Sequence, residues 1–263
     1  NVTHKTVTFL CSRIVQIKLD TMQQLFITIT IISLMTSCYS LDEKKDLNRE
    51  FIDLLNEDSI QFNPSGTTIQ TRFLTPSNYE RIKLDSSSFG YYLRTLPLKL
   101  HGEHVKLYNG NLKTNQSVHA AVVDQDIDPV DLQQCADAVM RLRGEYLFQS
   151  KQYKDIHFNF LSDGKPRHFT EYANGDLSYK KFRAYMKYIF SYANTASLKK
   201  ELTPVSIDSI LPGDVFIQSG NPYGHAVTVV DVAKDEYGKR IFLLAQSYMP
   251  AQETHLLINP TAP

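Results

Sequence analysis

Apolar residues recur every three or four positions in two long stretches of the chain. In the first, "LQQCADAVMRLRGEYL" (132–147), the apolar stripe runs through Leu132, Cys135, Val139 and Leu142. The second, 178–202, is richer in tyrosine and phenylalanine. This spacing gathers apolar side chains on one face of an α-helix. It predicts two helices, and it places Cys135 near the N-terminus of the first.

Other segments have the alternating or continuous apolar pattern of β-strands. Strands are expected within the ranges 69–73, 119–127, 155–160, 167–172 and 211–250, the last as a β-meander. Asn109-Gly110 and Asp163-Gly164 are typical of hairpin turns. Asp128 or Asp131 is expected to cap the helix that contains Cys135. Since helices and strands segregate along the chain rather than alternate, the pattern favours an α+β fold.

Composition narrows the classes of function. The 263 residues contain 28 Lys and Arg against 28 Asp and Glu, so the formal net charge is zero. A balanced surface argues against a nucleic-acid partner or a polybasic membrane contact, because both require positive charge. The three cysteines are scattered, the histidines lack metal-ligand spacing, and no phosphate loop or dinucleotide fingerprint occurs. No metal and no cofactor are therefore expected.

The first part of the chain has the pattern of an export signal. Residues 1–21 have no clear role, 22–38 form a short apolar segment ending in "LMTSC", and 39–50 read as a polar tether. Cys38 is a candidate for lipidation, and the alternative is a plain signal peptide cleaved near Ser40. Either interpretation predicts an exported protein, in the periplasm or as an outer-membrane-associated lipoprotein, touching the membrane only through that segment. A single α+β domain is expected over 51–263, truncated at its C-terminus.

Cys135, His225 and Gln246 supply the parts of a nucleophilic site in a plausible order. A helix N-terminus lowers the pKa of a cysteine, an imidazole can accept its proton, and a third polar side chain can orient that imidazole. His225 opens the apolar strand "HAVTVVDVA", and Gln246 lies in the next one, "FLLAQSYMP". A backbone N–H near Gln134 is expected to hold the oxyanion.

Two short segments of the chain resemble segments of the NlpC-type and CHAP-type papain-fold cysteine peptidases and amidases. In "LPGDVFI" a Gly-Asp pair opens a strand, and in "GHAVTVVDVA" a Gly-His pair opens the next. The resemblance covers about 130–250 and implies a papain-like arrangement, with a Cys-headed helix packed on an antiparallel meander after an N-terminal extension. It also implies acyl transfer on a peptide or cell-wall fragment by Cys135, His225 and Gln246. Ala136-Asp137 after the cysteine and a longer hairpin depart from that pattern.

A second resemblance covers more of the chain, about 65–260. The segments "TRFLTPSNYERI", "SFGYYLRTLPLKL", "QQCADAVMRLRGEYL", "IHFNF", "GHAVTVVDVA" and "LLAQSYMPAQETH" are similar to exported bacterial proteins grouped as domain of unknown function 4846. That family implies an envelope location but no established activity.

Several plainer interpretations stay open. Free cysteine is often buried, so Cys135 can equally be an inert core residue. The protein would then be a non-catalytic, envelope-anchored binding protein on the same scaffold, with its aromatic residues either lining a groove or filling the core. Asp231, on the same strand as His225, is an alternative orienting group at a distance of about 20 Å. A buried Arg141 could hold a substrate carboxylate.

Overall fold

A six-stranded antiparallel sheet organises the fold. The computed structural model describes residues 61–220 and 223–259, all within one compact unit, Ser59–Pro263. The strands run in the order β3-β8-β9-β10-β4, and β7 pairs with β8. They are β3 (Glu80–Arg81), β4 (His119–Val122), β7 (Val215–Gln218), β8 (His225–Lys234), β9 (Arg240–Gln246) and β10 (His255–Leu257). The predicted meander is thus confirmed.

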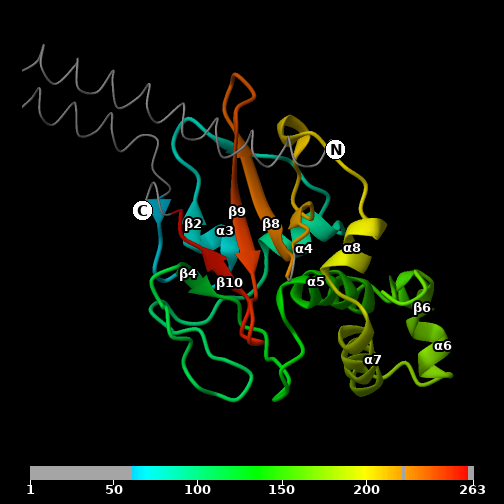
Figure 1. Ribbon diagram of the computed structural model, residues 1–263. Helices are drawn as coiled ribbons and strands as arrows, with labels where there is room; N and C mark the ends of the chain where they lie inside the picture. Colours follow the sequence, from blue (N-terminus) through cyan, green and yellow to red (C-terminus); the bar gives the residue numbers. More distant parts are fainter. Residues whose placement is uncertain (1–60, 221–222, 260–263) are drawn as a thin grey trace, which may run out of the picture. The chain divides into compact units, whose positions relative to one another are not determined.

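Strand β8 is the centre of this sheet. Its first residues pair with β7 and its last with β3, while β9 pairs along its other edge. Figure 1 shows β8 and β9 as a long twisted ribbon rising from the middle of the molecule. Nearly all of β8 is buried, because both faces of the strand are covered: Val230 packs with Leu142 of α5, and Val229 and Val232 pack with Ile210. The continuous apolar sequence of this strand follows from that burial.

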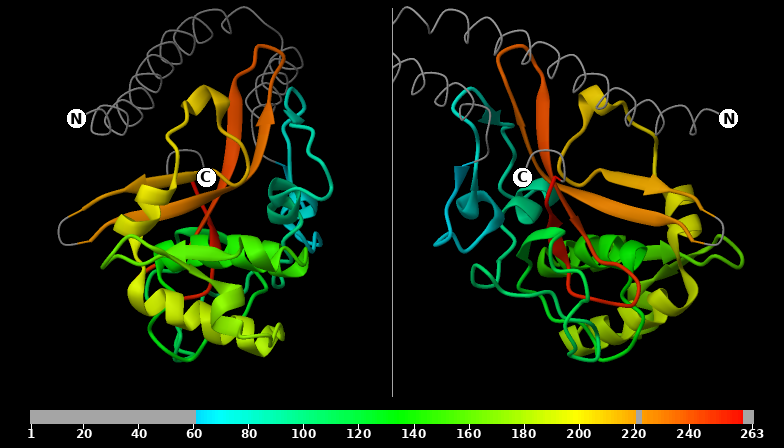
Figure 2. Two further views of the ribbon diagram at one scale, coloured as in Figure 1. Left: turned by 90° about the vertical axis from the view of Figure 1, so that its right-hand side faces the viewer. Right: turned by 60° about the vertical axis from the view of Figure 1, so that its left-hand side comes forward.

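Helix α5 (Cys135–Gln149) lies between the sheet and helix α7 (Tyr179–Tyr192), as Figures 1 and 2 show. Leu142 packs with Val230 and Ala245 of the sheet. Residues on other faces of α5, such as Met140, join the cluster around Phe182 of α7. The helix is therefore buried nearly all round. The predicted apolar stripe marks only part of its buried surface.

Helices α5 and α7 approach each other closely at Gly144. A Cβ atom at this position would lie 3.1 Å from the sulfur of Met186 and 3.3 Å from the ring of Phe182. Glycine costs helix stability relative to alanine, but here it lets the two helices pack without displacing those side chains.

Shorter elements complete the part of the chain that the structure describes. They are β1 (Gln61–Phe62), α3 (Ile69–Arg72), β2 (Phe73–Leu74), α4 (Phe89–Arg94), η2 (Tyr153–Asp155), β5 (His157–Asn159), β6 (Pro166–His168), α6 (Phe169–Ala173), α8 (Thr195–Glu201) and η3 (Ile207–Ser209). The described residues form both helices and strands, and several of each follow one another in the chain: α6 to α8 come first and β7 to β10 come after them. The predicted α+β class is thus confirmed. The predicted segments 1–21, 22–38 and 39–50, with Cys38, lie outside the described residues.

Three local predictions are wrong. The stretch 69–73 is mostly helical rather than a strand, because Thr71 Oγ1 accepts a hydrogen bond from the Thr68 N–H and begins a turn. The expected strand 167–172 ends at His168, where α6 begins. The helix expected over 178–202 is divided in two, because Asn194 caps α8 by accepting from the N–H groups of Ala196 and Ser197.

The two predicted hairpin turns both form, and Gly110 and Gly164 have positive φ angles of 83° and 65°. Strands β5 and β6 flank Gly164, whereas only the isolated bridge between Lys106 and Leu112 flanks Gly110.

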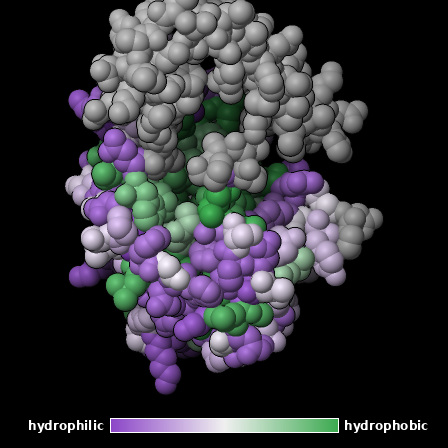
Figure 3. Space-filling model, turned by 90° about the vertical axis from the view of Figure 1, so that its left-hand side faces the viewer, coloured by the Kyte–Doolittle hydropathy of each residue, from purple (hydrophilic) through white to green (hydrophobic). Residues whose placement is uncertain are grey.

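On the face drawn in Figure 3, hydrophilic residues predominate below the grey atoms, and hydrophobic ones are scattered among them. Scattered apolar side chains are ordinary on a protein surface. In the part of the chain that the structure describes, no helix combines the length and the hydropathy needed to cross a bilayer.

Candidate functional site

Three chain segments distant in sequence bring Cys135, His225 and Gln246 together. Cys135 is the first residue of α5, which packs on β8, and His225 is the first residue of β8. The register pairs Thr228 of β8 with Ala245 of β9. Continued by one residue, it sets Gln246 beside Val227, two positions from His225 and on the same face of the sheet. The sheet register and the helix packing thus create the cluster.

His225 lies between the thiol and the amide. Its Nε2–H donates to Gln246 Oε1 at 2.7 Å, since an amide oxygen can only accept. The other nitrogen, Nδ1, is buried and has no hydrogen-bond partner of normal length. The Cys135 thiol nevertheless interacts directly with this ring, and each group shifts the pKa of the other. Nδ1 is therefore the nitrogen available to take the thiol proton.

The surroundings of Cys135 favour a thiolate. Burial raises the pKa of the thiol, but hydrogen bonding to His225 and to the Ala226 N–H, together with the charge of His225, lowers it below its ordinary value. The hydrogen bond to Cys135 raises the pKa of His225, with a further contribution from Gln246, against the opposing effect of burial. These opposite shifts are those of a thiolate–imidazolium pair.

The remaining neighbours of the sulfur come from α8 and from the residue before His225. Cys135 Sγ lies 3.9 Å from Thr195 Oγ1 and 3.9 Å from the Gly224 carbonyl oxygen. Gly224 allows this close packing, because a Cβ there would lie 2.7 Å from Gln218 O and 2.9 Å from Thr195 Cγ2. The sequence did not point to Thr195. The capping pattern at Asn194, which starts a new helix there, was the available signal.

Access to the sulfur is narrow. Cys135 is 7% exposed, while His225 and Gln246 are half-buried. The ring of Tyr248, itself 45% exposed, packs edge-on against His225 with the ring centroids 5.2 Å apart.

The N-terminus of α5 is capped by its own residues. The Gln134 N–H, for which the sequence predicts an oxyanion role, donates to Asp137 Oδ2 at 3.0 Å and to Leu132 O at 2.7 Å. It would have to leave these acceptors to hold an oxyanion, so that role stays a prediction. Neither expected cap is the capping residue: Asp128 pairs with Arg183, and Asp131 accepts from the Gln134 side chain.

Asp137 is a buried carboxyl group close to the thiol. Burial, with a smaller contribution from the nearby Cys135, raises its pKa to about 8 against the opposing effect of the hydrogen bond from Gln134. Its Oδ1 atom is buried without a hydrogen-bond partner. At neutral pH the group is largely protonated. It therefore adds little negative charge against a thiolate at Cys135.

We expect Asp137→Asn to remove a pH-dependent loss of stability. A carboxyl whose pKa is raised on folding favours the folded state below its unfolded pKa, and this contribution is lost as the pH rises through about 8. The amide keeps an oxygen for the Gln134 N–H and cannot ionise. The variant should be more stable than wild type at pH 9, by on the order of a few kcal/mol. Urea denaturation at pH 5 and pH 9 measures this, and an equal effect at both pH values would contradict it.

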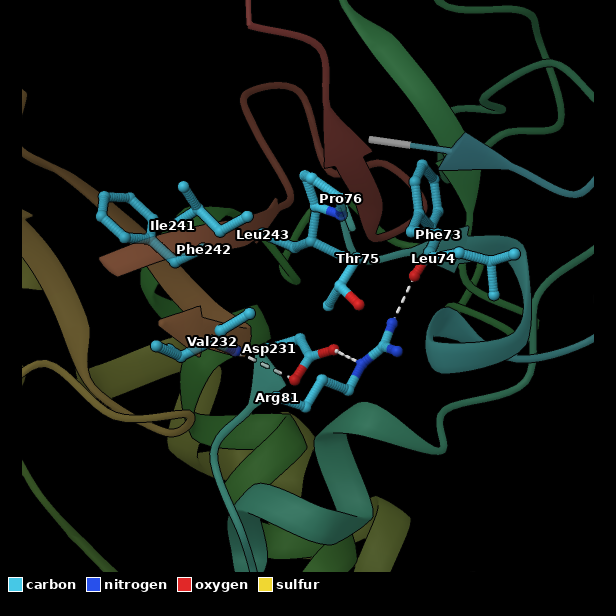
Figure 4. Close-up of a pocket in the computed structure, with 11 residues that line it drawn as sticks. Phe73, Leu74, Thr75, Pro76, Arg81, Asp231, Val232, Ile241, Phe242 and Leu243 are labelled. Carbon is cyan, nitrogen blue, oxygen red and sulfur yellow. Dashed lines mark hydrogen bonds and ion pairs between the residues drawn. The ribbon is translucent and has the colours of Figure 1, made fainter. Parts of the chain in front are cut away.

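Asp231, the alternative orienting group, is committed elsewhere. Its two oxygens accept from Arg81 Nε at 2.6 Å and Arg94 Nε at 2.7 Å. Figure 4 shows the Arg81–Asp231 pair at the edge of a cavity lined by residues of β2, β8 and β9, with Arg81 also donating to the Phe73 carbonyl. This cavity contains none of Cys135, His225 and Gln246. Asp231 does not orient His225.

Arg141 is 1% exposed and is held by Glu145, by Gln133 and by the Asp126 carbonyl. These partners give it a role in fixing the chain before α5. Among the described residues, no group of three or more His, Cys, Asp or Glu side chains is placed to hold a metal ion. The aromatic residues were predicted either to line a groove or to fill the core, and Phe182 and Tyr185 fill the core.

Comparison with protein-family models gives a match to domain of unknown function 4846 over residues 69–178 and 168–263. Searches of curated proteins and of solved structures found no match. The matched ranges cover most of the chain, including Cys135, His225 and Gln246, in agreement with the resemblance noted in the sequence. The chain belongs to the family defined by domain of unknown function 4846.

Proposed function

We propose that the protein is a cysteine hydrolase that cleaves a peptide or amide bond by acyl transfer. The observation that carries this proposal is the position of His225, which donates from Nε2 to Gln246 and also interacts with a thiol whose pKa it lowers. A structural cysteine requires neither a hydrogen-bonded imidazole nor a partner for that imidazole. The papain-like comparison is supported by helix α5, which packs on an antiparallel sheet and thereby brings Cys135 together with His225 and Gln246.

The reaction would take two steps. In the first, the Cys135 proton passes to His225 Nδ1, and the thiolate attacks the carbonyl carbon. The leaving amine takes the proton from Nδ1 as its bond to carbon breaks, and an acyl thioester stays on Cys135. In the second, His225 takes a proton from water, whose oxygen displaces the thiolate and releases the carboxylic acid. Gln246 holds the ring in place through both steps, as the third member of a triad does.

The substrate class follows from location. If the apolar segment 22–38 directs export, the available amide bonds are those of envelope proteins and of cell-wall peptides. The low exposure of Cys135, 7%, suits an extended peptide better than a folded protein. On this proposal the protein works in the periplasm or on a membrane to which a lipid at Cys38 attaches it.

We expect an activated ester to acylate Cys135 selectively. The full chain would be treated with p-nitrophenyl acetate at pH 7, and the acetyl group located by peptide mass spectrometry. The peptide containing Cys135 should be labelled well before those containing Cys11 and Cys38, and Cys135→Ala should lose only that label. Uniform labelling of the three cysteines, or labelling of lysines alone, would show that Cys135 is not an activated nucleophile.

A non-catalytic binding protein on the same scaffold is the second candidate. The low exposure of Cys135, 7%, favours it, because a nucleophile must reach its substrate. This candidate predicts that Cys135 resists acylation in the folded protein and reacts only on unfolding. The same labelling experiment, repeated in urea, separates the two candidates.

A further inference from the structure

A fourth polar residue continues the line from Cys135 through His225 and Gln246. His255, in β10, is the direct register partner of Gln246 in β9, so the two side chains lie on the same face of the sheet. Gln246 Nε2 lies 3.4 Å from His255 Nε2, and His255 Nδ1 lies 2.9 Å from the carbonyl oxygen of Glu253. His255 is 0% exposed.

We infer that His255 is a positioning residue that fixes the orientation of the Gln246 amide and thereby sets the tautomer of His225. This inference rests on the proposed function for its chemical consequence, but the arrangement itself rests on the contacts. Sequence reasoning missed His255, because it follows the meander in a short strand that the pattern did not indicate.

The orientation follows from donors and acceptors taken in order. The Glu253 carbonyl can only accept, so His255 Nδ1 carries the hydrogen. In a neutral ring Nε2 is then an acceptor, and it accepts from the NH₂ group of Gln246. The Gln246 oxygen consequently faces His225 and requires a hydrogen on His225 Nε2. Nδ1 of His225 is left as the basic nitrogen beside Cys135.

Burial keeps His255 in the neutral form that this order requires. Burial, together with the charges of Lys113 and His119, lowers the pKa of His255 to about 4 against the opposing effect of the hydrogen bond to the Glu253 carbonyl. The His119 ring packs edge-on to His255 at 6.0 Å between centroids. At neutral pH, His255 thus serves as a fixed acceptor rather than a second base.

Imidazole ¹⁵N NMR of the full chain tests the inference directly. The measurement uses a Cys135→Ala background, in which His225 is not part of an ion pair, at a pH where its ring is neutral. We expect His225 with the hydrogen on Nε2 and His255 with the hydrogen on Nδ1. The opposite tautomer at either ring would overturn the inference without any further variant.

Two substitutions at His255 then separate positioning from packing. His255→Leu removes the acceptor and should give a mixture of His225 tautomers, while His255→Gln supplies an acceptor oxygen and should restore the single tautomer. Leu256→Ala is the matched control, since Leu256 is buried at 1% exposure on the opposite face of the same strand. An unchanged tautomer in His255→Leu, or the same mixture in Leu256→Ala, would overturn the inference.

Alkylation of Cys135 in the background with the cysteine intact links the arrangement to reactivity. Loss of this single hydrogen bond in His255→Leu should slow alkylation near pH 6 by roughly two- to tenfold, less than loss of His225 does. If His225→Ala has no effect, the proposed function fails, while the NMR result still decides the tautomer. If His225→Ala has its effect and His255→Leu has none, the inference fails and the proposed function stands.

Discussion

Replacing His225 with alanine is expected to move the pH midpoint of Cys135 alkylation upward. In the native protein, hydrogen bonding and charge from His225 lower the pKa of the thiol against the effect of burial. Without the imidazole the burial remains, so the pKa rises to its ordinary value or above. Below both midpoints the thiolate fraction falls tenfold for each unit of this change.

The effect of His225→Ala on the alkylation rate of Cys135 depends on pH. At a pH above both midpoints the two proteins carry a thiolate, and their alkylation rates should be similar. Near pH 6 the wild-type thiolate fraction is raised, because hydrogen bonding to His225 lowers the pKa of the thiol. The variant thiol lacks this hydrogen bond, and we expect its rate to fall on the order of 10²-fold, within the range attributed to a positioned general base.

The measurement follows iodoacetamide labelling of the peptide that contains Cys135, because Cys11 and Cys38 also carry thiols. His157→Ala is the matched control, since His157 is exposed, its Nδ1 lies by the Asp155 carbonyl and its ring packs against His168, none of which belongs to the site. The control should retain the wild-type midpoint. A wild-type midpoint near that of a free thiol, unchanged in His225→Ala, would show that the imidazole does not activate Cys135.

Local sequence signals were sufficient for the elements that carry the three predicted residues. The apolar spacing predicted a helix whose first residue proved to be Cys135, and the apolar pattern over 211–250 predicted the strands that contain His225 and Gln246. Periodicity depends only on neighbouring residues, so it can be read without the tertiary structure. The α+β class follows from the same patterns.

Features set by pairing between distant strands could not be predicted in this way. His255 meets Gln246 only because β10 pairs with β9 in a particular register, and register is a property of two segments. The break between α7 and α8, which sets Thr195 beside the sulfur, depends on one capping residue within a strongly periodic stretch. The residues predicted as nucleophile, base and orienting group could thus be found from the sequence, whereas the neighbours that support them could not.

The buried ion pairs of Asp231 explain why a second carboxylate on β8 has no place in the site, and they predict a large effect on stability. The side chains of Asp231 and Arg94 are 5% and 7% exposed, and that of Arg81 is 23% exposed. They connect β8 with α4 and β3, elements more than a hundred residues earlier in the chain. Removing one partner of a buried pair leaves the other charge without compensation, which is the costly case.

Asp231→Ala is expected to destabilise the folded protein by about 3–5 kcal/mol, because it leaves the guanidinium of Arg94 buried and unpaired. Asp163→Ala breaks an ion pair of similar length, 2.8 Å, with Arg167, but these side chains are 37% and 28% exposed. The control should lose far less stability, because solvent screens an exposed pair. Urea denaturation at pH 7 compares the two variants, and equal losses would contradict the structural role of Asp231.

The fraction of Asp231→Ala that folds should keep the wild-type midpoint of Cys135 alkylation, since Asp231 holds arginines and not His225. A shifted midpoint would instead return Asp231 to the site.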